Sequence, residues 1–182
     1  MTLIKSYRFC DDADRVLERK AMTKSYWMLV DSVHSFRKAK EHDFKVHGVK
    51  ALQLKKVQRM AEGDQLLFYL FDLKKFGATA ILTSSIREST DPPWDIADKD
   101  DYQYRISIKP EVVLEEDKFI DAFQIGPSLQ YLKRWPPESW PLAFIGYLHL
   151  IPKLDFLLIE EEMKKINRNR KSSGRNSFSR KS

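Results

Sequence analysis

The order of strand-like and helix-like segments constrains this chain more than any other feature of its sequence. Four runs favour strands because they are apolar and β-branched or alternate between apolar and polar residues. They lie at residues 25–31, 62–71, 76–86 and 102–115. Helix-like segments are concentrated towards the two ends. The strands and helices do not alternate, which disfavours a doubly wound parallel sheet. The order predicts an α+β fold with a small, mostly antiparallel, curved sheet or barrel.

Short local signals predict where the elements begin and end. Asp31 and Ser32 have side chains that accept hydrogen bonds from backbone N–H groups, so they are suitable N-caps for a helix over 33–42. Pro152 lies inside the apolar segment 141–166, and a proline tends to end a helix at the preceding residue. We therefore expect two helices in that segment.

The positive charge of the chain is concentrated at its C-terminal end. The formal net charge is +6, but residues 163–182 contain eight Lys and Arg residues and no acidic residue. This stretch has few apolar groups, so burial cannot offset the entropy lost on ordering. We predict an N-terminal extension at 1–23, a domain at 24–166 and a basic disordered tail at 167–182. The tail would either keep the protein soluble or bind phosphates without sequence preference.

Several classes of protein are disfavoured by composition. No apolar run approaches the roughly 20 residues of a membrane span. The first residues do not read as a signal peptide, and Cys10 is the single cysteine of the chain. We therefore expect a cytoplasmic protein that does not associate with membranes.

The sequence contains no pattern typical of an active site. Its four histidines are scattered, its six glycines form no phosphate loop, and no nucleophile motif is present. Asp64 follows Gly63 ahead of a strand, which favours a turn residue over a catalytic acid. We expect no enzyme activity, no metal and no cofactor.

Aromatic and cationic residues remain as candidates for a binding site. They are Trp27, Tyr69, Trp94 and the consecutive residues Lys133, Arg134 and Trp135, which precede two prolines. Aromatic side chains stack on unpaired nucleic-acid bases, which stabilises binding by about 1–3 kcal/mol per base, and cations contact the flanking phosphates. A second interpretation stays open, in which Trp27 and Tyr69 are core residues and Trp94 fills a loop.

The motifs of this chain, taken in order, resemble those of an EVE domain over roughly residues 25–165. The motifs are "YWMLVDS", "VHGVK", "EGDQLLFYL", "FGATAILTSS", "YQYRISIKP", "LKRWP" and "AFIGYLHLIPKLDFLLIEE". The EVE family belongs to the PUA-like superfamily, together with YTH and ASCH domains. The resemblance implies a small bent β-barrel of about five to six mostly antiparallel strands flanked by helices. It also implies non-catalytic binding of RNA or DNA, often through a modified or flipped base in an aromatic pocket.

The resemblance further implies which residues form the site. It places the end of the first strand at the mouth of the pocket, and a basic corner around Trp135 near it. His47 stands where members usually carry a tryptophan that serves as one wall of the pocket. The expected binding residues are Trp27, Asp31, Ser32, His47, Gly48, Tyr69, Trp94, Lys133, Arg134 and Trp135.

Two other functions stay open at the level of sequence. One is a hydrolase of the ASCH-like type that processes nucleotides or nucleic acids, with Lys133, Asp31 or Asp64 as the reactive group. The other is a protein-interaction module with a vestigial pocket. The sequence does not distinguish RNA from DNA, and it predicts neither the base nor the oligomeric state.

Overall fold

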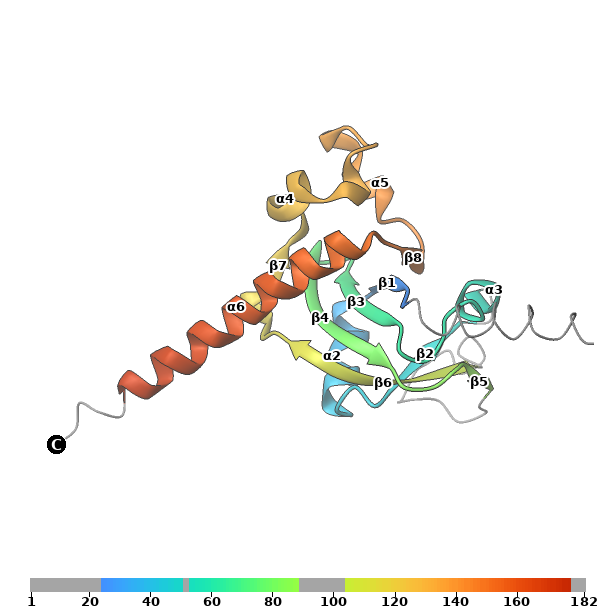
Figure 1. The fold of residues 1–182 in the computed structure, drawn as a ribbon, viewed down its shortest axis with the longest axis horizontal. Coiled ribbons are helices and arrows are strands. Elements are labelled where there is room, and N and C mark those ends of the chain that lie inside the picture. Colours follow the sequence, from blue (N-terminus) through green and yellow to red (C-terminus); the bar gives the residue numbers. More distant parts are fainter. Residues whose placement is uncertain (1–23, 51–52, 89–103, 178–182) are drawn as a thin grey trace, which may run out of the picture.

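The computed structural model describes residues 24–50, 53–88 and 104–177, with side chains in the last helix as far as Asn169 (Figure 1). Three parts of the sequence interpretation lie outside the described residues. They are the N-terminal extension 1–23, the loop that contains Trp94, and residues 178–182 of the expected tail.

Short strands and helices follow one another along the described chain. The elements are β1 (Tyr26–Asp31), α2 (Val33–Glu41), β2 (Val46–Val49), α3 (Leu54–Val57), β3 (Gln65–Leu70), β4 (Lys75–Leu82), β5 (Arg87–Glu88), β6 (Tyr104–Val113), β7 (Ile120–Asp121), α4 (Ala122–Ile125), α5 (Trp140–Ala143), β8 (Leu148–Leu150) and α6 (Lys153–Ser177). Short 3-10 helices cover Glu116–Lys118, Gly126–Ser128, Gln130–Leu132 and Pro137–Ser139.

The strands form one mixed sheet in the order β2-β6-β4-β3-β1-β8, with β5 beside β6 and β7 beside β4. β1 pairs with β3 in parallel, and the other described pairs are antiparallel. A parallel pair needs a crossover connection, which here contains α2, β2 and α3. The predicted α+β class and its mostly antiparallel sheet are confirmed.

Tyr147 joins the two ends of this sheet. Its backbone carbonyl accepts a hydrogen bond of 2.8 Å from the N–H of Val30 in β1. Its side-chain hydroxyl donates a hydrogen bond of 2.7 Å to the carbonyl of Gly48 in β2. Since β2 and the β1–β8 pair stand at opposite ends of the strand order, the sheet curls until its edges meet. This closure produces the bent barrel that we expected.

One face of the sheet, which we call the α2 face, carries the aromatic core beneath helix α2. Leu29 and Phe68 are paired in register, so their side chains point to the same side. Phe36 of α2 packs edge-on against Phe68, with ring centroids 6.0 Å apart, and against Phe44, at 5.1 Å. Asp31 lies two residues after Leu29 and therefore on the same face.

The opposite face, the α6 face, is covered by helix α6 and by the chain around α5 (Figure 1). Tyr26 packs against Phe156 of α6, with ring centroids 5.1 Å apart. Phe156, Ile159 and Met163 are each at most 1% exposed, and their spacing places them on one side of the helix. The fold thus buries both faces of its central strands.

The expectation of two helices over 141–166 is wrong in its first half. Only α5 is helical there, and the chain then turns at Gly146, which has a φ of 129° that glycine adopts without strain. Leu148–Leu150 forms β8, which pairs with the open edge of β1. An apolar run without clear periodicity suits a buried helix or a strand, and here strand pairing prevails.

Residues 167–177, which we expected to be disordered, continue helix α6 through Ser177 in the structure. Extending an existing helix adds one backbone hydrogen bond per residue and avoids the unfavourable nucleation step. Residue 166, the proposed end of the domain, lies inside this helix. None of the described helices is both long and apolar enough to cross a lipid bilayer.

Candidate functional site

Strand β1, the start of α2 and strand β2 meet around a group of polar residues at the point where the barrel closes. We call this group the Asp31–His47 cluster; it consists of Asp31, Ser32, His47, Gly48 and Tyr147. The residues Asp31 and His47 are 9% and 2% exposed, respectively. The His47 ring packs edge-on against Phe68 on the α2 face, with centroids 5.8 Å apart, and its Nε2 lies 3.2 Å from the Tyr147 hydroxyl.

Hydrogen bonds to the start of α2 orient one side of the cluster. Ser32 is the N-cap of α2, as predicted, and its Oγ accepts the Ser35 N–H at 3.1 Å. Asp31 Oδ1 accepts the Ser32 N–H at 2.8 Å. Asp31 Oδ2 is buried, and no described residue donates a hydrogen bond to it. A buried acceptor without a partner is costly, which marks this oxygen as a point where a ligand could donate a hydrogen bond.

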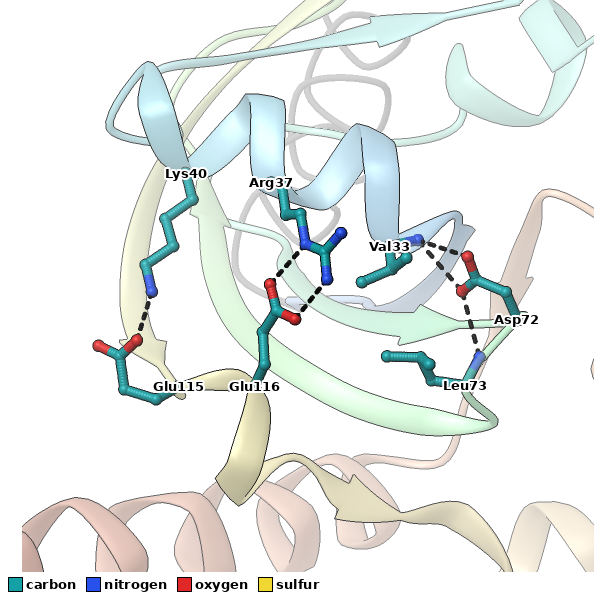
Figure 2. A network of polar contacts seen from close by, with 7 residues as sticks. All are labelled: Val33, Arg37, Lys40, Asp72, Leu73, Glu115 and Glu116. Carbon is teal, nitrogen blue, oxygen red and sulfur yellow. Dashed lines mark hydrogen bonds and ion pairs between the residues drawn. The ribbon is translucent and has the colours of Figure 1, made fainter.

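Ion pairs along α2 fix the helix that carries this cap (Figure 2). Arg37 donates two hydrogen bonds of 2.6 Å to Glu116, and Lys40 pairs with Glu115 at 2.7 Å. At the helix start, both carboxylate oxygens of Asp72 accept the Val33 N–H, at 3.1 and 3.0 Å. These exposed contacts add little stability each, but together they restrain where Ser32 sits.

Burial sets the protonation of the two ionisable residues in the cluster. It raises the pKa of the Asp31 carboxyl above its ordinary value, against the opposing effects of nearby His47, the Ser32 N–H and the Ser35 side chain. It also lowers the pKa of the His47 imidazole, while the charge of Asp31 acts in the opposite direction. His47 is therefore a neutral ring at neutral pH, suited to stacking and to hydrogen bonding with Tyr147.

Trp27 belongs to the core, as the second interpretation anticipated. It is 5% exposed, and its Nε1 donates a hydrogen bond of 2.8 Å to Asp64 Oδ2. Asp64 also accepts the N–H groups of Ser25, at 2.9 Å, and Ala61, at 3.0 Å. Asp64 is thus a turn residue that ties the start of β1 to the start of β3. The structure does not bring Trp27 into the cluster.

Tyr69 lies on the opposite face of the sheet from His47. It is paired in register with Val30, whereas Phe68, which contacts His47, is paired with Leu29. Tyr69 stacks on Phe144 with centroids 4.4 Å apart and planes 22° apart, and burial raises the pKa of its hydroxyl to about 12. The aromatic pocket expected from Trp27, Tyr69 and His47 together is therefore not formed.

The basic corner at Lys133, Arg134 and Trp135 also lies away from the cluster. It follows a 3-10 helix between α4 and α5, and Figure 1 shows this segment on the far side of α6 from α2 and β6. All three residues are exposed, Trp135 by 39%. The Trp135 carbonyl accepts the Trp140 Nε1–H at 3.1 Å, so the two prolines brace a turn whose core residue is Trp140.

The positions of these residues disfavour the hydrolase alternative. Its three proposed groups do not converge, because Lys133 lies on the α4–α5 segment and Asp64 is occupied by three N–H donors. Asp31 alone belongs to the cluster. Within the described residues, no three His, Cys, Asp or Glu side chains are placed to share a metal ion.

Sequence reasoning missed Tyr147, which contributes the hydroxyl of the cluster. It missed as well a cavity of about 260 Å³ on the α6 face, where Tyr69 and Phe144 lie beside the exposed Phe71 and Ile145. A second cavity, of about 420 Å³, lies between α6 and the chain around β7 and α4. Neither of these two cavities is lined by a residue of the cluster. A single tyrosine in an apolar run gives no signal of a partner 99 residues away.

No protein-family model matches the chain, and no curated protein does either. Solved structures do resemble it. A hypothetical protein from Leishmania major is 15% identical with a TM-score of 0.54, and the match covers 81% of this chain and 99% of that one. The YTH domain of Mmi1, solved with RNA, is 11% identical with a TM-score of 0.56, over 81% of this chain and 82% of that one.

The YTH domain of the Zygosaccharomyces rouxii MRB1 protein, solved with N6-methyladenosine RNA, is 15% identical. Its TM-score is 0.52, and the match covers 79% of this chain and 86% of that one. At these identities the likeness concerns the fold. The chain has an α+β fold with a curled sheet flanked by helices, and its arrangement is similar to that of these YTH domains.

Proposed function

We propose that the chain is a non-catalytic RNA-binding module that holds one base of a single strand against the Asp31–His47 cluster. The observation that carries this proposal is the buried Asp31 Oδ2, to which no described residue donates a hydrogen bond. It lies where β1 ends and the barrel closes, beside an imidazole that burial keeps neutral. The fold of YTH domains solved with RNA supports the same assignment.

The chemistry of the cluster suits a nucleic-acid base. A carboxylate is an acceptor, so it pairs with the N–H groups on a base edge, such as the amino group of cytosine or the imino and amino groups of guanine. Donation from a base would favour the charged form of Asp31, which burial otherwise disfavours. The flat face of the His47 ring would serve as a stacking surface, smaller than that of the tryptophan expected there, once the side chains that bury it move aside.

We extend the proposal to a flipped or chemically modified base. The cluster is buried, so a base would reach it only if the surrounding side chains move and only after the base leaves the stack of its neighbours, which costs least in a single strand. Unstacked bases of single-stranded RNA are the usual targets of sequence-specific recognition. EVE-domain membership, suggested by the order of the sequence motifs, belongs to the same proposal.

The experiment compares binding by the parent and by cluster variants. Single-stranded RNA and DNA of the same sequence, with and without methylated bases, are titrated by fluorescence anisotropy. His47→Ala should weaken binding about 5- to 150-fold, the equivalent of about 1–3 kcal/mol for one stacked base. His34→Ala is the matched control, because His34 is an exposed histidine on α2. It should bind as the parent does.

Asp31→Asn tests the hydrogen bond separately, because the asparagine keeps the size of the side chain and an oxygen for the Ser32 N–H. We expect it to weaken binding of the preferred base and to leave other sequences unaffected. The exposed Asp117 supplies the control Asp117→Asn. A parent that binds no oligonucleotide, or cluster variants that bind like the parent, would refute the proposal and favour a protein-interaction module.

A further inference from the structure

Helix α6 is longer than its contact with the barrel requires. Its buried residues end at Met163, and Asn167 donates a hydrogen bond of 3.5 Å to the carbonyl of Val113 at the end of β6. The helix nevertheless continues through Ser177. Figure 1 shows that its C-terminal part runs past the edge of the sheet, so this part of α6 is a projecting arm.

Basic residues occur along this arm at the spacing of one helical face. Lys164, Arg168, Lys171 and Arg175 follow one another at intervals of four, three and four residues, which places them on one line along the helix. We call this set the α6 stripe; it extends over about 16 Å at 1.5 Å per residue. Lys165 and Arg170 do not fall on this line.

The outer part of the stripe has no acidic residues with which to pair along the helix. Lys164 pairs with Glu160 at 2.8 Å, and Arg168 lies 3.9 Å from Glu161. After Glu162 the sequence contains no acidic residue, so the positions three and four before Lys171 and Arg175 lack a carboxylate. Like charges at this spacing destabilise a helix by about 0.2–0.5 kcal/mol per pair, and a bound polyanion would remove that cost.

We propose that the α6 stripe binds the phosphate backbone of single-stranded RNA. This inference rests on the proposed function. A regular row of cations on a projecting arm suits a row of phosphates. A membrane surface fits less well, because residues 164–177 contain one apolar residue, Ile166, and a membrane-bound helix needs an apolar face.

The test compares two double variants with the same charge change on the same helix. Lys171→Gln/Arg175→Gln removes two stripe cations, and Lys165→Gln/Arg170→Gln removes two others. Glutamine forms helices about as well as lysine and arginine, so circular dichroism should show equal helicity. The probe is a labelled single-stranded RNA of about 12 nucleotides, within the range of known site sizes. It is titrated from about 50 to about 200 mM salt.

Each phosphate contact on a single strand contributes about −0.7 to the slope of log affinity against log salt. The stripe variant should therefore lose about 1.4 from the magnitude of this slope, and about 25-fold in affinity at about 0.1 M salt. The off-stripe variant should change by less than half as much. Binding of free nucleosides, which have no phosphate, should be the same in all three proteins.

Each outcome decides between the two proposals. Equal losses of RNA affinity and salt slope in both double variants would show that only the overall positive charge of the helix matters, and would overturn the inference. Nucleoside and RNA binding by the parent together with an unchanged stripe variant would overturn the inference alone. A parent that binds neither would overturn the proposed function as well. Loss of binding to phosphatidylserine vesicles, with RNA binding intact, would assign the stripe to membranes instead.

Discussion

Replacing Trp27 with phenylalanine should destabilise the protein and leave its RNA affinity unchanged. The substitution removes the Nε1–H that donates to Asp64 Oδ2 at 2.8 Å in a buried site. A hydrogen bond to a charged group contributes about 1.5–3 kcal/mol, and the smaller ring leaves a small unfilled volume. The same oxygen of Asp64 keeps its bond from the Ala61 N–H, so it is not left without a donor. We therefore expect a loss of about 2–4 kcal/mol, on average less than the roughly 3–5 kcal/mol typical of truncating a buried tryptophan to alanine.

Urea unfolding followed by far-UV circular dichroism measures this loss, because that signal does not depend on the tryptophan removed. Trp135→Phe is the control; Trp135 is 39% exposed and should change stability by less than about 0.5 kcal/mol. A double-mutant cycle with Asp64→Asn should give a coupling energy of about 0.5–3 kcal/mol. Unchanged stability together with weakened RNA binding would show that Trp27 contacts a base, and would refute its assignment to the core.

Three further outcomes follow from the packing and the buried charges. Burial raises the pKa of Asp31. The stability that Asp31 contributes is therefore complete at a pH below its ordinary pKa of 3.8 and is lost as the pH rises through the raised pKa. Asp31→Asn should for this reason increase the melting temperature at neutral pH. Burial lowers the pKa of His47. The stability that His47 contributes is therefore complete at a pH above its ordinary pKa of 6.5 and is lost as the pH falls through the lowered pKa. His47→Gln should lessen the fall in melting temperature at acid pH, measured in a pH series of thermal melts. Gly126→Ala should cost about 1–3 kcal/mol in chemical unfolding, because the added methyl group would lie 2.8 Å from Trp140 Cε3, and Trp140→Leu should relieve that cost.

The central strands were predictable because their residues carry the signal locally. An apolar run follows Gly63 and Asp64 and becomes β3, and the N-cap at Ser32 needs only the residues beside it. By contrast, β8 exists because β1 offers an unpaired edge, which is a property of the assembled sheet. The same residues in an apolar run would suit a buried helix equally well.

The candidate site was predictable only in part, for a related reason. Asp31 and Ser32 lie where β1 ends, His47 and Gly48 lie within the short strand β2, and the four come together where the barrel closes. Tyr69 was misplaced because one residue of register decides which face it occupies, and the β1–β3 pairing is not visible in sequence. Tyr147 was missed because its contact with Gly48 spans 99 residues.

The most direct test of base binding at the Asp31–His47 cluster is to follow the imidazole signals of the four histidines by NMR while single-stranded RNA is added. We predict that the His47 resonances shift with RNA concentration, because a base would stack on its ring beside Asp31. The exposed His34 and His42 should shift little, so they serve as internal controls in the same sample. Unchanged His47 resonances at saturating RNA would contradict base binding at the cluster, since the strand would then bind elsewhere on the protein.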